Sequence, residues 1–144
     1  MNSSLSLIHI TTKKKLDKIL KTGYLVPHES DREKGVYMVI KLNNNLIKQR
    51  PILKLFGNFV IEINQNILFN RNDYSIFEAY KENNDELFGG KIVYDAHTDN
   101  IKQLPNIIEN LTLLNEIKFN NKISLKKYIH NIYQIDTTNN LILI

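Results

Sequence analysis

The 144-residue sequence contains no cysteine and no tryptophan, and only five glycines and three prolines. Without cysteine, the chain can form neither disulfides nor thiolate zinc sites. No apolar run reaches the length of a membrane span, and the N-terminus lacks the apolar core of a signal peptide. We therefore expect a soluble, cytoplasmic protein that does not insert into a membrane. The length suits one domain over residues 1–144.

Positive charge is in modest excess, with a formal net charge of +4. Such a balance can indicate a nucleic-acid-binding protein. However, Asn, Ile and Lys make up 57 of the 144 residues, which is typical of an AT-rich coding sequence, and arginine is scarce. The densest basic run, residues 13–15, is interpreted as the solvated face of a helix start. A basic nucleic-acid-binding protein of another fold is therefore the less favoured alternative.

The first forty residues carry the clearest structural signals. An apolar stretch predicts a strand over residues 7–11, and Thr11 or Thr12 can cap the helix that follows. Apolar residues at 16, 19 and 20 share one helical face, which predicts a helix over residues 12–22. Gly23 stands where that helix can end in a left-handed turn. Residues 36–40 are rich in β-formers and predict a second strand.

The rest of the chain gives weaker patterns. Residues 59–63 and 91–94 predict strands, and part of 41–55 predicts a helix. Residues 101–117 have helical apolar spacing, Ser124 can cap a further helix that extends to Ile132, and residues 141–144 predict an edge strand. The order of a strand, a helix, several strands and then helices indicates an α+β fold.

Signals for metal, phosphate-loop or serine-nucleophile chemistry are weak. No phosphate-cradling glycine loop is present, because Gly89-Gly90 is not followed by a helix signature. No G-x-S-x-G motif occurs. Four histidines are scattered without helical i, i+4 pairing, so no metal site is expected; they are His9, His28, His97 and His130.

Two motifs within residues 7–40 resemble those of a known enzyme family. Leu7-Ile8-His9-Ile10-Thr11 resembles the first NAD-binding motif of ADP-ribosyltransferases of the diphtheria-toxin and poly(ADP-ribose) polymerase type. A helix ending in Ile-Leu, then Gly, an apolar residue and Pro, follows in the same order. Lys34-Gly35-Val36-Tyr37-Met38 then resembles the family's Gly-Ile-Tyr-Phe strand. The resemblance implies an ADP-ribosyltransferase-like split β-sheet core with flanking helices, and NAD as the co-substrate.

The resemblance also implies roles for residues of these motifs. His9 would hydrogen-bond a ribose hydroxyl on the adenosine side of NAD, and Thr11 would support that pocket. Gly35 and Tyr37 belong to the second motif, and Tyr37 would stack on the nicotinamide ring, where an aromatic face gains both area and geometry. Ile10 takes a position at which the family frequently has glycine, and its side chain is expected to crowd the site.

A second aromatic wall for the nicotinamide is assigned by position alone. Tyr80 could form it, and Tyr74 is an equally good candidate. Together with His9, Thr11, Gly35 and Tyr37, Tyr80 completes the expected NAD-binding set.

The third element that the resemblance implies is a glutamate that opens a late strand and stabilises positive charge developing on the ribose. Ile92-Val93-Tyr94-Asp95 resembles the family's closing strand, but a direct overlay puts Gly90 at the catalytic position. Glu86 stands four residues earlier, and an insertion would reconcile it. Glu86 is therefore the expected catalytic residue, with Glu78 and Glu82 as less favoured alternatives.

Two functions follow as expectations. The first is transfer of ADP-ribose from NAD to a macromolecular acceptor, either protein or nucleic acid. A chain this small would suit a toxin, a phage or viral effector, or a small modifying enzyme. The alternative is a non-catalytic module that binds a nucleotide or a partner on the same fold.

Overall fold

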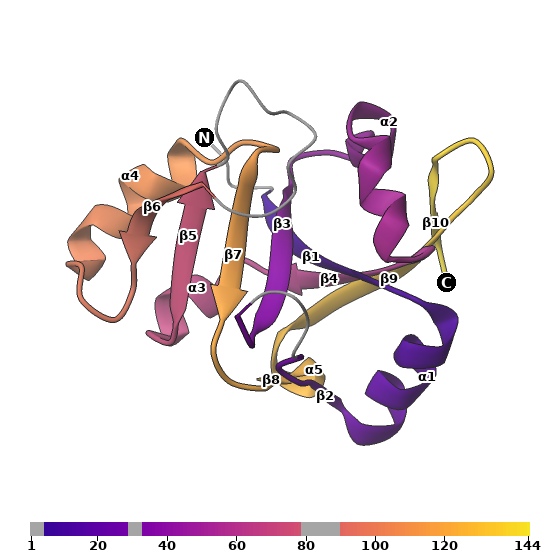
Figure 1. The fold of residues 1–144 in the computed structure, drawn as a ribbon, viewed down its shortest axis with the longest axis horizontal. Helices are drawn as coiled ribbons and strands as arrows, with labels where there is room; N and C mark the ends of the chain where they lie inside the picture. Colours follow the sequence, from indigo (N-terminus) through magenta and orange to yellow (C-terminus); the bar gives the residue numbers. More distant parts are fainter. Residues whose placement is uncertain (1–4, 29–32, 79–89) are drawn as a thin grey trace.

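The computed structural model describes residues 5–28, 33–78 and 90–144 (Figure 1). These residues form a mixed α+β fold that is dominated by one large antiparallel sheet. Its eight strands are β1 (Ser6–Thr11), β3 (Val36–Lys41), β4 (Phe59–Asn64), β5 (Tyr74–Glu78), β6 (Lys91–Asp95), β7 (Asn115–Phe119), β9 (Ile129–Ile135) and β10 (Leu141–Leu143). A separate two-stranded sheet pairs β2 (Tyr24–Leu25) with β8 (Ile123–Ser124). The expected α+β class is confirmed at this level.

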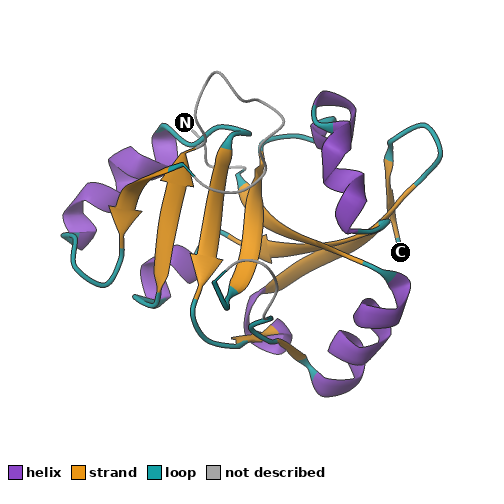
Figure 2. Cartoon of the chain, viewed as in Figure 1, coloured by secondary structure: helices purple, strands orange, loops and turns teal. Residues whose placement is uncertain are grey.

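The order of strands across the large sheet is β10-β9-β4-β1-β3-β7-β5-β6. β1 therefore lies between β4 and β3, and β7 lies between β3 and β5. Figure 2 shows the strands at the centre of the molecule and the helices around them. The helical segments are α1 (Lys13–Thr22), α2 (Leu46–Gln49), η1 (Pro51–Phe56), α3 (Ile67–Asn70), η2 (Ile101–Gln103), α4 (Leu104–Glu109) and α5 (Leu125–Tyr128).

Helix α1 begins and ends where its local sequence dictates. The Thr12 hydroxyl accepts a hydrogen bond from the Lys15 amide at 3.3 Å, which satisfies one of the free amides of the first turn. Gly23 adopts the left-handed conformation (φ +81°) and its amide donates to the Ile19 carbonyl at 2.7 Å. The predicted helix with its cap and its terminating glycine is confirmed.

The core lies on both faces of the sheet because side chains alternate along each strand. Leu7 and Met38 belong to the larger buried cluster, whereas Ile8 and Val39, which are directly opposite each other on β1 and β3, belong to the smaller one. Residues on β3 that share a face with Val39 therefore point away from the larger cluster. Tyr37 is one of these residues.

Among the described residues, no helix has the length and apolar character needed to cross a membrane.

The strands predicted at residues 7–11, 36–40, 59–63, 91–94 and 141–144 correspond to β1, β3, β4, β6 and β10, and α2 with η1 gives the helix expected within 41–55. Residues 101–117 are helical only at their beginning, in η2 and α4, so the prediction is wrong beyond Glu109 and most clearly from Asn115 onward. There β7 is paired on both sides, with β3 and with β5. All five β7 residues are buried, although Glu116, Ile117, Lys118 and Phe119 alternate between polar and apolar, and the helical spacing of the apolar residues before them hid this alternation.

The helix predicted after Ser124 is confirmed only for its first turn. The Ser124 hydroxyl accepts from the Lys127 amide at 3.3 Å, as expected for a cap. The helix then ends at Tyr128, and Ile129 and Ile132 belong to β9. Pairing with β4 over five residue positions replaces the intrahelical hydrogen bonds that continuation would have made. Residues 129–135 therefore form a strand of the large sheet rather than the expected continuation of the helix.

Candidate functional site

The neighbouring strands β1 and β3 separate after a short ladder. Three residue pairs join them, the last of which is Ile8 opposite Val39, while β1 continues alongside β4 as far as Thr11. Beyond this ladder, His9 Nδ1 lies 2.9 Å from the Tyr37 carbonyl oxygen. Because that oxygen can only accept, Nδ1 carries the proton and donates. A side chain of β1 thus bonds the β3 backbone where the ladder has ended.

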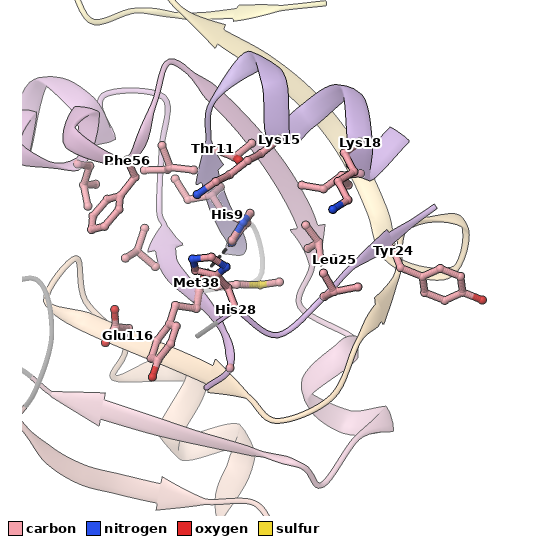
Figure 3. A pocket seen from close by; sticks show the side chains of 18 of the residues that line it. His9, Thr11, Lys15, Lys18, Tyr24, Leu25, His28, Met38, Phe56 and Glu116 are labelled. Carbon is pink, nitrogen blue, oxygen red and sulfur yellow. Dashed lines mark hydrogen bonds between the residues drawn. The ribbon is translucent and has the colours of Figure 1, made fainter. Parts of the chain in front are cut away.

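A cavity of about 540 Å³ lies at this separation of the two strands. Its volume is in the range of small-molecule sites. The cavity extends between β1 and β3, so side chains from both faces of the sheet line it. Met38 lines it from one face and Val39 from the other. Figure 3 shows helix α1 along one side of the cavity and Glu116 at the opposite side. Polar groups that line it include His9, Thr11, Lys15, Lys18, Tyr37 and Glu116.

His9 is kept neutral by its surroundings. Burial lowers its pKa below the ordinary value, the hydrogen bond to the Tyr37 carbonyl opposes this shift, and the charge of Lys15 lowers the pKa further. With the proton on Nδ1, the other ring nitrogen, Nε2, is a hydrogen-bond acceptor. His9 can therefore accept a hydrogen bond from a ligand hydroxyl in the cavity.

Tyr37 is fixed at both ends. Its backbone carbonyl accepts from His9, and its hydroxyl donates to the Glu33 carbonyl at 2.5 Å. Lys118, directly opposite Tyr37 on β7, is almost fully buried and forms a 2.8 Å ion pair with the carboxylate of Glu33. The hydrogen bond from Lys118 lowers the pKa of Glu33. Glu33 is therefore held by two contacts, one from the Tyr37 hydroxyl to its carbonyl and one from Lys118 to its carboxylate. These contacts keep the segment that precedes β3 beside the Tyr37 ring.

Gly35 is required by this packing. A Cβ atom built on Gly35 would stand 2.6 Å from Cγ of Lys118 and 3.1 Å from the Phe119 carbonyl oxygen. Any side chain would displace the Lys118 stem and with it the ion pair to Glu33. Gly35 also lines the cavity. The second motif has glycine at this position because a side chain there would collide with Lys118.

Glu116 is the functional candidate that the sequence reasoning missed. It is the second residue of β7, lies directly opposite Val39 of β3, is 4% exposed and lines the cavity. Side chains opposite each other share a face, so Glu116 lies on the same face as Tyr37, two residues along β3. The available signal was its position near the start of a late strand, which the helical spacing of residues 101–117 obscured.

Thr11 is buried beside the cavity with an unused polar atom. It is 2% exposed, and its hydroxyl oxygen makes no hydrogen bond within the described part of the chain. A buried hydroxyl without a partner costs free energy. Thr11 lines the same cavity as His9.

Tyr74 does not form an aromatic wall of this site. Its ring is buried in the larger core cluster, 5.2 Å from the Phe119 ring, and its hydroxyl donates to the Leu68 carbonyl at 2.7 Å. It lies opposite Phe119, which in turn lies opposite Val36, so it is on the face away from Tyr37. The interpretation of Tyr74 as a nicotinamide contact is therefore wrong. Phe56 at the end of η1 is an aromatic residue that does line the cavity.

Four predicted site residues remain, and the structure describes one of them. Tyr80, Glu82 and Glu86 lie outside the described residues. Glu78 ends β5, opposite Asn115, and is not among the residues that line the cavity. Strand β6, interpreted as the family's closing strand, is at the edge of the sheet and is separated from β3 by β5 and β7.

No group of three or more His, Asp or Glu side chains in the described ranges could hold a metal ion. Comparison of the chain with protein-family models, with curated proteins and with solved structures found no match.

Proposed function

We propose that this chain binds NAD in the cavity and transfers its ADP-ribose to a macromolecular acceptor. The observation that carries the proposal is that His9, Tyr37 and Glu116, from three adjacent strands, line one cavity. The first two residues belong to the motifs that resemble those of ADP-ribosyltransferases. Glu116 supplies the glutamate near the start of a late strand that the same resemblance requires.

The charges of the cavity suit the reaction. In NAD the nicotinamide ring is cationic and the diphosphate is anionic. Glu116 lies on one side of the cavity and the lysines of α1 lie on another, so a bound NAD has a counter-charge available for each part (Figure 3). Tyr37 offers its ring to the nicotinamide, and His9 Nε2 accepts from a ribose hydroxyl.

The transfer itself needs one bond exchange at the anomeric carbon of the nicotinamide ribose. The C–N bond breaks and nicotinamide leaves with the electron pair, while a lone pair of the acceptor forms the new bond and the acceptor loses its proton. The ribose passes through an oxocarbenium-like state, as in glycoside hydrolysis. The Glu116 carboxylate stabilises this positive charge more strongly than it stabilises the bound substrate, which accelerates the step.

The test is transfer of label from labelled NAD to proteins and nucleic acids of a cell lysate, together with loss of NAD. We expect Glu116→Gln to lower the rate by roughly 10²–10³-fold, the magnitude typical of removing one preorganised electrostatic group. Glu109→Gln, an exposed substitution on α4, is the matched control and keeps the wild-type rate. Thermal unfolding of each variant confirms that it is folded.

Two outcomes contradict the proposal in different ways. If wild type neither transfers label nor consumes NAD, the enzymatic function is wrong. If Glu86→Gln abolishes transfer and Glu116→Gln does not, the function stands but Glu116 is not the catalytic carboxylate.

Ile10 favours the second candidate, a non-catalytic nucleotide-binding module. Its side chain lines the cavity at a position where the family frequently has glycine. Calorimetry with NAD distinguishes the two functions, since the module predicts binding without turnover. Under that function Ile10→Gly changes affinity but gives no transfer.

A further inference from the structure

One wall of the cavity carries two cations whose charge nothing in the described chain neutralises. Lys15 and Lys18 both line the cavity from α1, and neither ammonium group has an ion-pair partner among the described residues. Their neighbour Lys13 differs, because it is bound to Asp17 at 2.6 Å, one turn along the helix. Figure 3 shows the two cavity lysines extending from the helix over the cavity.

The spacing of these lysines matches a ligand with adjacent anionic groups. Residues three apart on a helix have Cβ atoms about 5–6 Å from each other, so both flexible side chains can reach one diphosphate. Thr22 and Ile19 extend the same face of α1 along the cavity. Glu116 is the one carboxylate among the described residues that line the cavity, and it lies on the opposite side.

We propose that Lys15 and Lys18 form a phosphate-binding subsite, which takes the diphosphate of the dinucleotide. The assignment to a dinucleotide rests on the proposed function, whereas the assignment to phosphate rests on the two lysines and the cavity. Ammonium groups bind phosphate oxygens by charge-assisted hydrogen bonds. Apolar side chains also line the cavity, including Leu53 and Phe56 of η1, and they offer surface for a ring system beside the phosphates.

The test compares Lys15→Gln and Lys18→Gln with Lys14→Gln. Lys14, Lys15 and Lys18 are all exposed on the same helix, but Lys14 does not line the cavity, so its substitution makes the same change in net charge without touching the subsite. The ligands are ADP-ribose, its 2′-phosphorylated form, adenosine and inorganic pyrophosphate, titrated into isotope-labelled protein and followed by NMR. We expect each cavity substitution to weaken ADP-ribose and pyrophosphate roughly tenfold, the loss of one charge-assisted hydrogen bond. Adenosine binding stays unchanged in every variant, and Lys14→Gln behaves like wild type.

The ligands distinguish the source of the phosphate. If the substitutions weaken the 2′-phosphorylated ligand tenfold but leave ADP-ribose unchanged, the lysines bind a ribose phosphate and the diphosphate assignment is wrong. Equal affinities of wild type and both cavity variants for every phosphate ligand overturn the subsite itself. An equal loss for adenosine overturns it as well, because a phosphate contact cannot affect adenosine.

Failure of this inference is distinguishable from failure of the proposed function. Pyrophosphate binding that depends on Lys15 and Lys18 supports the phosphate subsite even if no NAD is turned over. Conversely, label transfer by wild type with unchanged KM for NAD in Lys15→Gln and Lys18→Gln confirms the function and rejects the subsite.

Discussion

Glu62 on β4 and Glu116 on β7 are almost equally buried, at 3% and 4% exposed, but they have different surroundings. Glu62 lies among side chains that bond it directly. Its carboxylate oxygens receive Ser6 Oγ at 2.5 Å, Lys41 Nζ at 2.9 Å, Tyr133 OH at 3.0 Å and Asn131 Nδ2 at 3.2 Å. Glu116 instead faces a cavity large enough for a small molecule.

The two environments give the carboxylates different purposes. Burial raises the pKa of Glu62, but hydrogen bonds from Ser6, Lys41 and Asn131 outweigh it and lower the pKa to about 2. The charge of Glu62 thus serves to tie β1, β3, β4 and β9 together. Since Glu116 lines the cavity, its charge can act on a ligand. Equal burial therefore does not indicate equal function. The groups around each carboxylate decide whether its charge stabilises the fold or is available to a ligand.

The largest expected contrast is in stability. Glu62→Gln leaves Lys41 buried without its counter-charge, so we expect it to lower the free energy of unfolding by about 3 kcal/mol. Glu116→Gln keeps the side-chain volume and a hydrogen-bonding group at the cavity, and we expect a smaller loss of about 1 kcal/mol. Urea unfolding of the two variants and wild type measures both values. A loss in Glu116→Gln as large as that in Glu62→Gln would show that Glu116 is structural too.

We expect a smaller difference between wild type and Glu62→Gln in how their stability depends on pH in acid. Folding lowers the pKa of Glu62 from 4.5 to about 2, so its stabilisation is fully present above pH 4.5 and is lost as pH falls toward 2. The stability of wild type should fall more steeply across this window than that of Glu62→Gln. Asp73 and Asp136, whose pKa values are also lowered, are present in both proteins and cancel in the comparison. Parallel pH profiles in urea unfolding would contradict the pairing of Glu62.

The smallest expected difference in stability is between substitutions of two neighbouring threonines. The Thr12 hydroxyl is hydrogen-bonded, and the Thr11 hydroxyl has no partner within the described chain. Thr12→Val removes the cap of α1 and should cost about 1 kcal/mol. Thr11→Val replaces a buried hydroxyl, unbonded within the described chain, by a methyl group, so we expect stability unchanged or raised by up to about 1 kcal/mol. Thermal unfolding of both variants measures the difference. An equal loss in both variants would show that the Thr11 hydroxyl is bonded in solution.

The site could be predicted from sequence only where its signals are local. His9 and Tyr37 were predicted because the short motifs that carry them resemble those of ADP-ribosyltransferases, and these motifs lie in a stretch where short-range interactions determine the strand, the capped helix and the turn at Gly23. Glu116 was missed because Ile107, Ile108 and Leu111 give the preceding stretch a helical spacing, which hid the short polar–apolar alternation of residues 116–119. Its strand pairs with β3 and β5, whose partner residues are about forty to eighty positions away in the chain.

The sequence by itself determined β1, α1 with both of its ends, and β3, since capping, periodicity and the left-handed glycine act within a few residues. Tertiary structure decided that residues 115–119 and 129–135 are strands, because distant partners supply the backbone hydrogen bonds that stabilise them there. It also decided which carboxylates are buried in a network and which face the cavity. That difference depends on which strands become neighbours, and no local pattern encodes it.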